Sequence, residues 1–421
     1  MNSLRCGVDP KDFIWASGIE DTFVPQTRPG HRALDEYALM EHYEHWRMDL
    51  ALLRELQVQA VRWGVPWYRV EPIAGEFDWR WTDKVVAYLV EALKITPIID
   101  LMHYGCPFWL RREFASEEYP KAVARYAGAF AQRYRRWIKW YTPLNEPLVT
   151  ALFCGKRGLW PPYLRSDRGY IFILMQLVKG ILRTVEAIKA VDSNSVMVHV
   201  DASGLSRAAR EDLEALAVED QRRGFLVYDL LTGKLTPDHP LFSWLVRQGA
   251  SPDELSSIRR SRISLDMIGL NFYPQWSTTQ LYINRHGKLA YRSVERDGSG
   301  FVGLIRDFYN RYRTKIIVTE TSARGNVTLR SRWLKASVAA IKLLRGEGIP
   351  VHGYTWFPLF TMIDWRYRFG RKPLKDYRLE LGLYKLAKAH QSHRWQPTSL
   401  VEQFQSYVRD PMNAIGSLAA Q

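Results

Sequence analysis

Short apolar runs alternate with longer amphipathic stretches along the whole chain. The apolar runs are rich in β-branched and aromatic residues, which is typical of buried β-strands. These runs predict strands over Phe13–Ala16, Ala60–Trp63, Pro97–Leu101, Trp140–Leu144, Ser195–Val200, Met267–Asn271, Lys315–Thr319 and Gly353–Trp356. Between them, apolar residues at helical spacing predict helices over Arg47–Leu56, Asp83–Leu93, Pro120–Trp137, Tyr170–Val191, Glu211–Phe225 and Arg330–Leu344.

This alternation predicts an α/β fold with a parallel sheet. Eight strands separated by helices are typical of a (β/α)8 TIM barrel, and we expect residues 1–421 to form that single domain. The polar stretch Trp276–Gly300 follows the sixth predicted strand and is expected to be a long loop or a hairpin. In such a barrel the active site lies at the C-terminal face of the strands.

Two glutamates each end a predicted strand. Glu146 closes the string TPLNE at residues 142–146, and Glu320 closes IIVTE at residues 316–320. If these strands belong to one barrel, both side chains project into the same mouth from roughly opposite walls. Glycoside hydrolysis needs two such carboxyl groups, because one protonates the leaving oxygen while the other attacks the sugar carbon or activates water. Either motif alone is weak evidence, since a strand-end carboxylate can also be structural.

The chain is basic, with 59 Lys and Arg residues against 44 Asp and Glu residues and a net charge of +15. The basic residues are spread along the sequence without a sustained block, which argues against nucleic acid as a partner. An acidic substrate and an anionic membrane surface stay open as partners. No stretch approaches the roughly 20 apolar residues of a transmembrane helix. No apolar leader opens the sequence, so we expect a cytoplasmic protein.

Signals for a metal or a cofactor are weak. Three sparse cysteines give no disulfide framework. Two pairs of histidines are spaced three residues apart, as metal ligands on a helix can be: His42 with His45, and His390 with His393. Neither pair has a third ligand nearby in the sequence, so we expect no metal. No Gly-x-Gly-x-x-Gly loop precedes a helix, and we expect no cofactor.

A series of short strings runs in order along nearly the whole chain. The longest of them is WIKWYTPLNEP at Trp137–Pro147. The others are Phe13–Ala16, Asp49–Leu56 with Ala60–Trp63, Trp67–Pro72, Leu101–Pro107, Gly269–Tyr273, and Gly353–Trp356 through Asp364–Trp365. In this order the strings resemble glycoside hydrolase family 1, the β-glucosidase family of barrel enzymes. The resemblance implies a TIM barrel with β-glycosidase activity.

The resemblance also implies a role for each strand-end side chain. Glu146 would be the general acid and base, which requires a raised pKa, and Glu320 the nucleophile, which must stay ionised. Arg62 would lie beside Glu320 and favour that ionised form, while Tyr273 would hydrogen-bond to it. The remaining residues implied at the substrate are Asn145 at the sugar 2-hydroxyl, His103 at another hydroxyl, Trp356 or Phe357 under the ring, and Asn271, Asp364 and Trp365.

Three positions depart from the family pattern. Glu320 is followed by Thr-Ser-Ala rather than Asn-Gly, and Phe23 takes the place of a sugar-clamping Gln, unless the loop slides to bring in Gln26. The family's Glu-Trp becomes Asp364-Trp365. A basic cluster follows that pair: Arg366, Arg368, Arg371 and Lys372. This cluster is either a solvated loop or a site for an anionic sugar.

We therefore predict a retaining β-glycosidase that hydrolyses O-glycosidic bonds through a covalent glycosyl–Glu320 intermediate. Its carboxyl groups are expected about 5–5.5 Å apart. Three alternatives stay open: a transglycosidase that uses the same site, a non-catalytic barrel that binds a glycan or a protein, and a catalytic module that works with a separate partner. The oligomeric state is left open.

Overall fold

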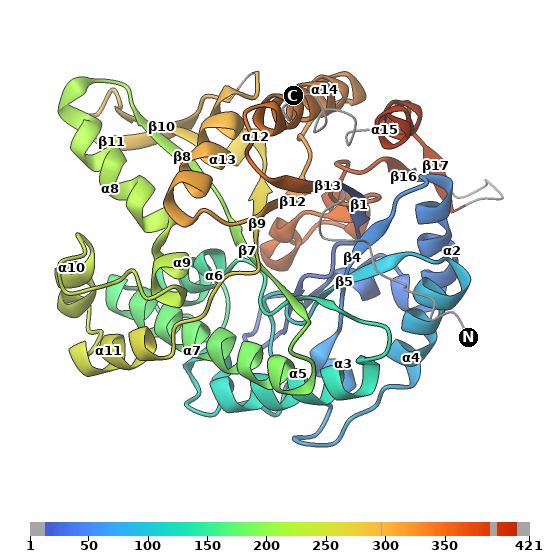
Figure 1. The fold of residues 1–421 in the computed structure, drawn as a ribbon, viewed down its shortest axis with the longest axis horizontal. Helices are drawn as coiled ribbons and strands as arrows, with labels where there is room; N and C mark the ends of the chain where they lie inside the picture. Colours follow the sequence, from blue (N-terminus) through green and yellow to red (C-terminus); the bar gives the residue numbers. More distant parts are fainter. Residues whose placement is uncertain (1–12, 296, 388–393, 411–421) are drawn as a thin grey trace, which may run out of the picture.

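Eight parallel strands close into a barrel in the computed structural model of the chain (Figure 1). The structure describes residues 13–295, 297–387 and 394–410. In order around the barrel the strands are β1 (Ile14–Gly18), β13 (Val351–Trp356), β12 (Ile316–Thr321), β9 (Met267–Phe272), β7 (Val196–Ala202), β6 (Trp140–Thr142), β5 (Thr96–Asp100) and β4 (Ala60–Gly64). Each of these strands overlaps a predicted one, and the predicted TIM barrel is confirmed.

Helices surround the barrel as an outer layer (Figure 1). The principal ones are α2 (His42–Glu55), α4 (Arg80–Ala87), α5 (Tyr119–Tyr134), α7 (Asp167–Val191), α8 (Glu214–Gly224), α9 (Leu226–Leu231), α13 (Ser299–Tyr312), α14 (Val327–Gly346) and α15 (Leu400–Arg409). All six predicted helices overlap observed ones. Helices α7 and α14 begin three residues earlier than predicted, because Ser166 and Asn326 cap their first turns with side-chain oxygens.

A small sheet lies beside α8, outside the barrel (Figure 1). It contains β8 (Leu205–Ala208), β10 (Thr278–Ile283) and β11 (Leu289–Ser293). Strands β10 and β11 pair antiparallel, so the stretch expected as a loop or a hairpin contains a hairpin. Short helices on the connections are α1 (Glu36–Leu39), α3 (Trp67–Val70), α6 (Pro147–Ala151), α10 (Phe242–Arg247), α11 (Pro252–Arg260) and α12 (Pro274–Ser277).

Two apolar layers hold the barrel together. The inner layer fills the barrel with small and aliphatic side chains and one indole: Ile14, Ala16, Ala60, Ile98, Trp140, Val198, Val200, Met267 and Ile317. The much larger outer layer packs between the strands and the helices. Because side chains alternate along a strand, the inward set continues at the C-terminal ends with polar residues. Those inward polar residues are Arg62 on β4, Asp100 on β5, Asn271 on β9 and Thr319 on β12.

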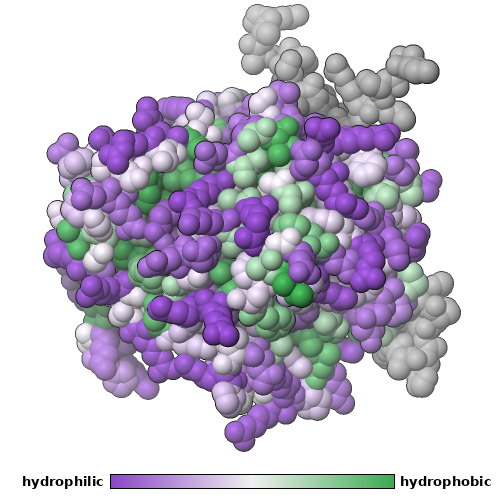
Figure 2. Space-filling model, turned by 90° about the horizontal axis from the view of Figure 1, so that it is seen from below, coloured by the Kyte–Doolittle hydropathy of each residue, from purple (hydrophilic) through white to green (hydrophobic). Residues whose placement is uncertain are grey.

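The face of the molecule seen from below is mostly hydrophilic, with apolar residues in small scattered groups (Figure 2). Within the described parts of the chain, no helix is long and apolar enough to cross a membrane.

His42 is buried and hydrogen-bonds Asp49 with its Nδ1 at 2.7 Å. The second histidine pair, His390 and His393, lies outside the described residues.

Candidate active site

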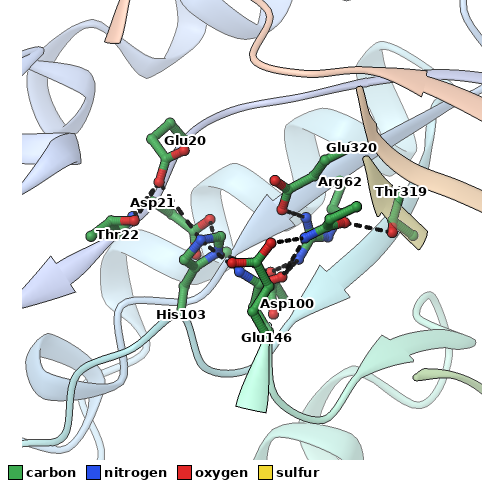
Figure 3. A network of polar contacts seen from close by, with 12 residues as sticks. Glu20, Asp21, Thr22, Arg62, Asp100, His103, Glu146, Thr319 and Glu320 are labelled. Carbon is green, nitrogen blue, oxygen red and sulfur yellow. Dashed lines mark hydrogen bonds and ion pairs between the residues drawn. The ribbon is translucent and has the colours of Figure 1, made fainter. Parts of the chain in front are cut away.

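Both glutamates predicted to be catalytic lie at the C-terminal end of the barrel strands (Figure 3). Glu320 is the penultimate residue of β12, whereas Glu146 follows β6 and is the N-cap residue of α6. Only 6% of Glu146 and 4% of Glu320 is exposed. Glu146 has a φ of 46°, and Tyr104, which contacts it, has a φ of 77°. Such left-handed conformations are uncommon outside glycine and cluster at functional sites.

Arg62 and Tyr273 hold the carboxyl group of Glu320. Arg62 Nη1 donates to Oε1 in a buried ion pair, and the Tyr273 hydroxyl donates to Oε2 at 2.7 Å. At the other end of the guanidinium, Nη2 donates to Asp100 Oδ2 and to Asn145 Oδ1, the latter at 2.6 Å. Burial lowers the pKa of Arg62, but the charges of Asp100 and Glu320 outweigh it and raise the pKa. The guanidinium therefore stays charged and faces the Glu320 carboxyl group as a charged donor.

The carboxyl group of Glu146 receives its hydrogen bonds from uncharged donors among the described residues. The Tyr104 hydroxyl donates to Oε2, and Asn271 Nδ2 donates to Oε1 at 2.8 Å. Burial and the charge of Glu320 raise the pKa of Glu146 to about 7. A carboxyl group with this pKa is partly protonated at neutral pH, which a general acid requires.

Two amide side chains connect the surroundings of the two glutamates. Thr319 Oγ1 donates to Asn271 Oδ1 at 2.7 Å, which turns Asn271 Nδ2 toward Glu146 and toward Asn145 Oδ1 at 3.1 Å. Asn145 Oδ1 also accepts from Arg62. The orientation of both amides is therefore fixed by their partners, and the two carboxyl groups share one hydrogen-bonded network.

His103 lies on the side of this network that faces the segment after β1 (Figure 3). Its Nδ1 is 2.9 Å from Asp21 Oδ1 and 3.1 Å from Asp100 Oδ2, while its Nε2 is 2.9 Å from Asn145 Nδ2. Burial lowers the pKa of His103, but the two aspartates outweigh burial and raise it. The Asn145 amide opposes this, because its N–H needs an acceptor at Nε2. The two aspartates nevertheless favour the protonated ring, whose Nδ1–H faces both carboxylates.

Among the described residues, one group of side chains is arranged as metal ligands can be, and it belongs to this network. Asp21, Asp100 and His103 each place one ligand atom within 4.8 Å of the other two. Arg62 donates to the same oxygen of Asp100 that faces His103. A cation in this position would lie next to the guanidinium, so these residues fit hydrogen bonding better than metal coordination.

Comparison with known proteins decides the family. A sequence model described as glycosyl hydrolase family 1 matches residues 16–372. The chain belongs to glycosyl hydrolase family 1. It is 22% identical to β-glucosidase A of Thermotoga maritima over 362 residues, which cover 79% of this chain and 80% of that protein. It is 20% identical to a 1,4-β-D-glucan glucohydrolase of Thermotoga neapolitana over 370 residues, which cover 79% and 84%. These similarities support glycoside hydrolase activity.

Solved family 1 structures share the fold. The T. maritima β-glucosidase in complex with noeuromycin superposes with a TM-score of 0.79 at 19% identity, covering 95% of this chain and 98% of that one. The complex of the same enzyme with isofagomine lactam gives a TM-score of 0.80 at 17% identity, with the same coverage. The expected family membership and barrel are thus confirmed.

The structure brings most of the residues expected from the family together, but not Trp356. Its side chain packs in the outer layer with no exposed surface, and its Nε1 donates to the Leu381 carbonyl at 3.1 Å. The next residue, Phe357, faces the barrel mouth instead, with its ring 5.6 Å from the Arg62 guanidinium carbon and against Gly18. Strand alternation therefore places Phe357, rather than Trp356, at the barrel mouth.

Asp364 and Trp365 behave differently from each other. Trp365 packs edge-on against Tyr104 with ring centroids 5.3 Å apart, so it lies next to a donor to Glu146. Asp364 instead pairs with Arg366 at 2.7 Å and caps the short turn that follows.

Two of the four basic residues after Trp365 already have partners in the structure. Arg366 pairs with Asp364. Arg368 has no exposed surface, and it donates to three backbone carbonyls and one hydroxyl: those of Val24, Pro25, Arg32 and Tyr163. Arg368 therefore ties the loop after β13 to the loop after β1.

Phe23, expected at the sugar-clamping position, instead stacks on Tyr68 with centroids 3.6 Å apart.

Three residues that lie beside the glutamates were not identified from the sequence: Glu20, Asp21 and Tyr104. Glu20 comes next to His103, because Asp21 packs directly over Gly64, where a Cβ atom would lie 1.5 Å from Asp21 Oδ2. The signal available in the sequence was the adjacent acidic pair directly after the first strand.

Proposed function

We propose that this family 1 chain hydrolyses β-glycosides with retention, using Glu320 as nucleophile and Glu146 as general acid and base. The observation that carries the proposal is the contrast between two carboxyl groups in one buried network. A guanidinium donates to Glu320, whereas Glu146 has neutral donors and a pKa raised to about 7. Retaining hydrolysis needs one ionised and one protonated carboxyl group at the same sugar.

In the first step, a Glu320 oxygen attacks the anomeric carbon as the bond to the leaving oxygen breaks. Glu146 gives its proton to that oxygen, so the leaving group departs as a neutral alcohol. The positive charge that develops on the sugar ring is opposed by the Glu320 carboxylate. Arg62 and Tyr273 hold this carboxylate at a fixed angle, which limits the reorganisation needed to reach the transition state.

In the second step, Glu146 acts as the base. It is now ionised and takes a proton from water, which attacks the anomeric carbon and releases Glu320. Because the carbon is inverted twice, the product keeps the β configuration. This mechanism requires carboxyl groups about 5–5.5 Å apart, a separation that leaves no room for the water of an inverting enzyme.

The relatives suggest a β-glucoside as the first substrate to test, since they are named as a β-glucosidase and a β-glucan glucohydrolase. We propose that His103, Asn145 and Asn271 hold sugar hydroxyls next to the catalytic pair. Phe357 would supply the apolar floor under the ring, and Trp365 an apolar wall beside Tyr104.

The test measures nitrophenol release from aryl β-glycosides with neutral, acidic and 6-phosphorylated sugars, together with the anomer of the first product by NMR. We expect release from a neutral β-glucoside, the β-anomer appearing first, and no release from the matching α-glucoside. An α-anomer as first product would overturn the nucleophile assignment. Alkyl glycoside in place of free sugar on adding an alcohol would indicate a transglycosidase. A folded protein inactive on the whole panel would overturn hydrolysis.

A further inference from the structure

The catalytic network contains more carboxyl groups than cations. Its cations are Arg62 and His103, and its carboxyl groups are those of Glu20, Asp21, Asp100, Glu146 and Glu320 (Figure 3). Arg62 is shared between Glu320 and Asp100, and His103 between Asp21 and Asp100. The hydrolytic mechanism uses Glu146 and Glu320 and leaves Glu20 without a role.

Only one of the two carboxyl oxygens of Glu20 accepts a hydrogen bond from the described residues. The residue is 7% exposed, and its Oε1 accepts from the backbone N–H of Thr22 at 3.1 Å and from the Thr22 hydroxyl. Within the described part of the chain, Oε2 takes part in no hydrogen bond. Its nearest cationic neighbour is His103, whose Nε2 is 3.6 Å from Oε1 and already contacts Asn145. Within the described residues the one ion-pair partner of Glu20, His103, is therefore shared with Asp21 and Asp100.

Glu20 lies near both catalytic carboxyl groups. Burial raises the pKa of Glu20 to about 7, with a smaller contribution from the charge of Glu320. Burial and the catalytic carboxyl groups raise the pKa of Tyr104 and Tyr273, and the charge of Glu20 adds to both shifts. These tyrosines donate to the two catalytic carboxyl groups from the ends of other strands. Glu20 thus lies close to the catalytic pair, on the segment that follows β1 (Figure 3).

We propose that Glu20 makes this active site selective for glycosides whose terminal sugar carries a protonated amino group. The ammonium group would donate to the left-over Oε2 and would balance the excess of carboxyl groups. Inside a buried site, an ammonium–carboxylate pair is much stronger than in water. A neutral hydroxyl in the same place leaves the carboxylate without a counter-charge. This inference rests on the proposed function, because it assigns the substrate class of the same site.

The experiment compares 4-nitrophenyl β-D-glucopyranoside with its three analogues that carry an amino group at C2, C3 or C4, at about pH 6.5, where such amines are protonated. Each is tested on wild type and on two isosteric variants, Glu20→Gln and Glu113→Gln. Glu113 is the matched control, because it is also a 7% exposed glutamate but its charged neighbour is Arg368, outside the catalytic network.

We expect one amino glycoside to exceed the glucoside in kcat/KM by about tenfold or more. Glu20→Gln should abolish this preference, measured as the ratio of kcat/KM on the amino glycoside to kcat/KM on the glucoside, and Glu113→Gln should keep that ratio. If the glucoside is hydrolysed and no amino glycoside is preferred, or if the preference survives in Glu20→Gln, the inference fails while the proposed function stands.

If no glycoside is turned over, the proposed function fails, and binding decides the inference alone. Calorimetry would then compare free 3-amino-3-deoxyglucose, its 2-amino and 4-amino isomers and glucose on wild type and Glu20→Gln. Tighter binding of an amino sugar that depends on Glu20 supports the inference. Equal binding of all four sugars overturns it.

Discussion

Glu320 and Glu146 occupy the same buried network, but the donors to their carboxyl groups carry different charge. Glu320 receives hydrogen bonds from a guanidinium and a hydroxyl, whereas Glu146 receives them from a hydroxyl and an amide. One residue type is thereby placed in two different electrostatic surroundings within one mouth. The difference comes from Arg62 on β4, whose charge is directed at one carboxyl group and not at the other.

The largest loss of activity is expected from a substitution of Glu320. In Glu320→Gln the amide can accept the hydrogen bond from Arg62 but cannot attack the sugar. We expect kcat/KM to fall by about four orders of magnitude or more on every aryl glycoside. Nitrophenol release measures the loss, and thermal unfolding checks that the variant is folded, which we expect because Arg62 keeps Asp100 as a partner. Activity within tenfold of wild type would remove Glu320 from the mechanism.

Removing the other carboxyl group should affect substrates unequally. Glu146→Ala deletes the proton donor, so a poor leaving group such as methanol should be released about a hundredfold to ten thousandfold more slowly. Attack by Glu320 on a 2,4-dinitrophenyl glycoside needs little protonation and should be within about tenfold of wild type. Pre-steady-state release of the dinitrophenol isolates this step. Equal losses on both substrates would assign Glu146 a binding role instead.

The sequence was enough to place Arg62, Glu320 and Tyr273 in one site, because a barrel gathers the C-terminal ends of its strands at one mouth. Once Ala60–Trp63 and Lys315–Thr319 are assigned to strands, alternation places Arg62 inward and the strand ends lie at the mouth. Tyr273 follows in the same way, two residues after the inward Asn271. Glu320 follows the inward Thr319, and the pairing of β12 with β9 shifts register between Val318 and Glu320. Period-2 geometry is a local property, so a single sequence carries enough information for these positions.

The residues that could not be anticipated depend on register or on loop packing. The sequence left the choice between Trp356 and Phe357 open, because a slip of one residue moves a side chain to the opposite face of a strand. In the structure Trp356 points outward and Phe357 lies by Arg62. Glu20 comes next to His103 only because Gly64 lets the segment after β1 pack closely. That approach depends on tertiary contacts between distant segments, which no local pattern encodes.

A smaller effect, on the pH dependence of activity, is expected from a substitution of Tyr104. Glycosylation needs protonated Glu146, so kcat/KM for a poor leaving group should fall as the pH rises through the pKa of about 7. The Tyr104 hydroxyl stabilises the ionised form of Glu146 and lowers this pKa. Tyr104→Phe should therefore move the alkaline limb to higher pH, by roughly one unit or less.

The control for this shift is Tyr126→Phe. Tyr126 is fully buried, and its hydroxyl has no hydrogen-bond partner among the described residues. Its removal should leave the alkaline limb in place. A limb that moves to lower pH in Tyr104→Phe, or that does not move at all, would mean that Tyr104 does not set the protonation of Glu146.

The smallest effect is expected from a substitution of Asp364. Like Glu320, Asp364 pairs with an arginine, but the Asp364–Arg366 pair is much more exposed to solvent. The side chains of Arg366 and Asp364 are 71% and 15% exposed, against 1% and 5% for Arg62 and Glu320. Solvent-exposed ion pairs contribute little, so Asp364→Asn should change kcat/KM by no more than about twofold and the melting temperature by no more than about 2 °C. Asp78→Asn is the matched control, since Asp78 pairs with Arg80 at the same two-residue spacing. A tenfold loss of kcat/KM confined to Asp364→Asn would mean that this carboxylate leaves Arg366 and binds the sugar, as the family resemblance implies.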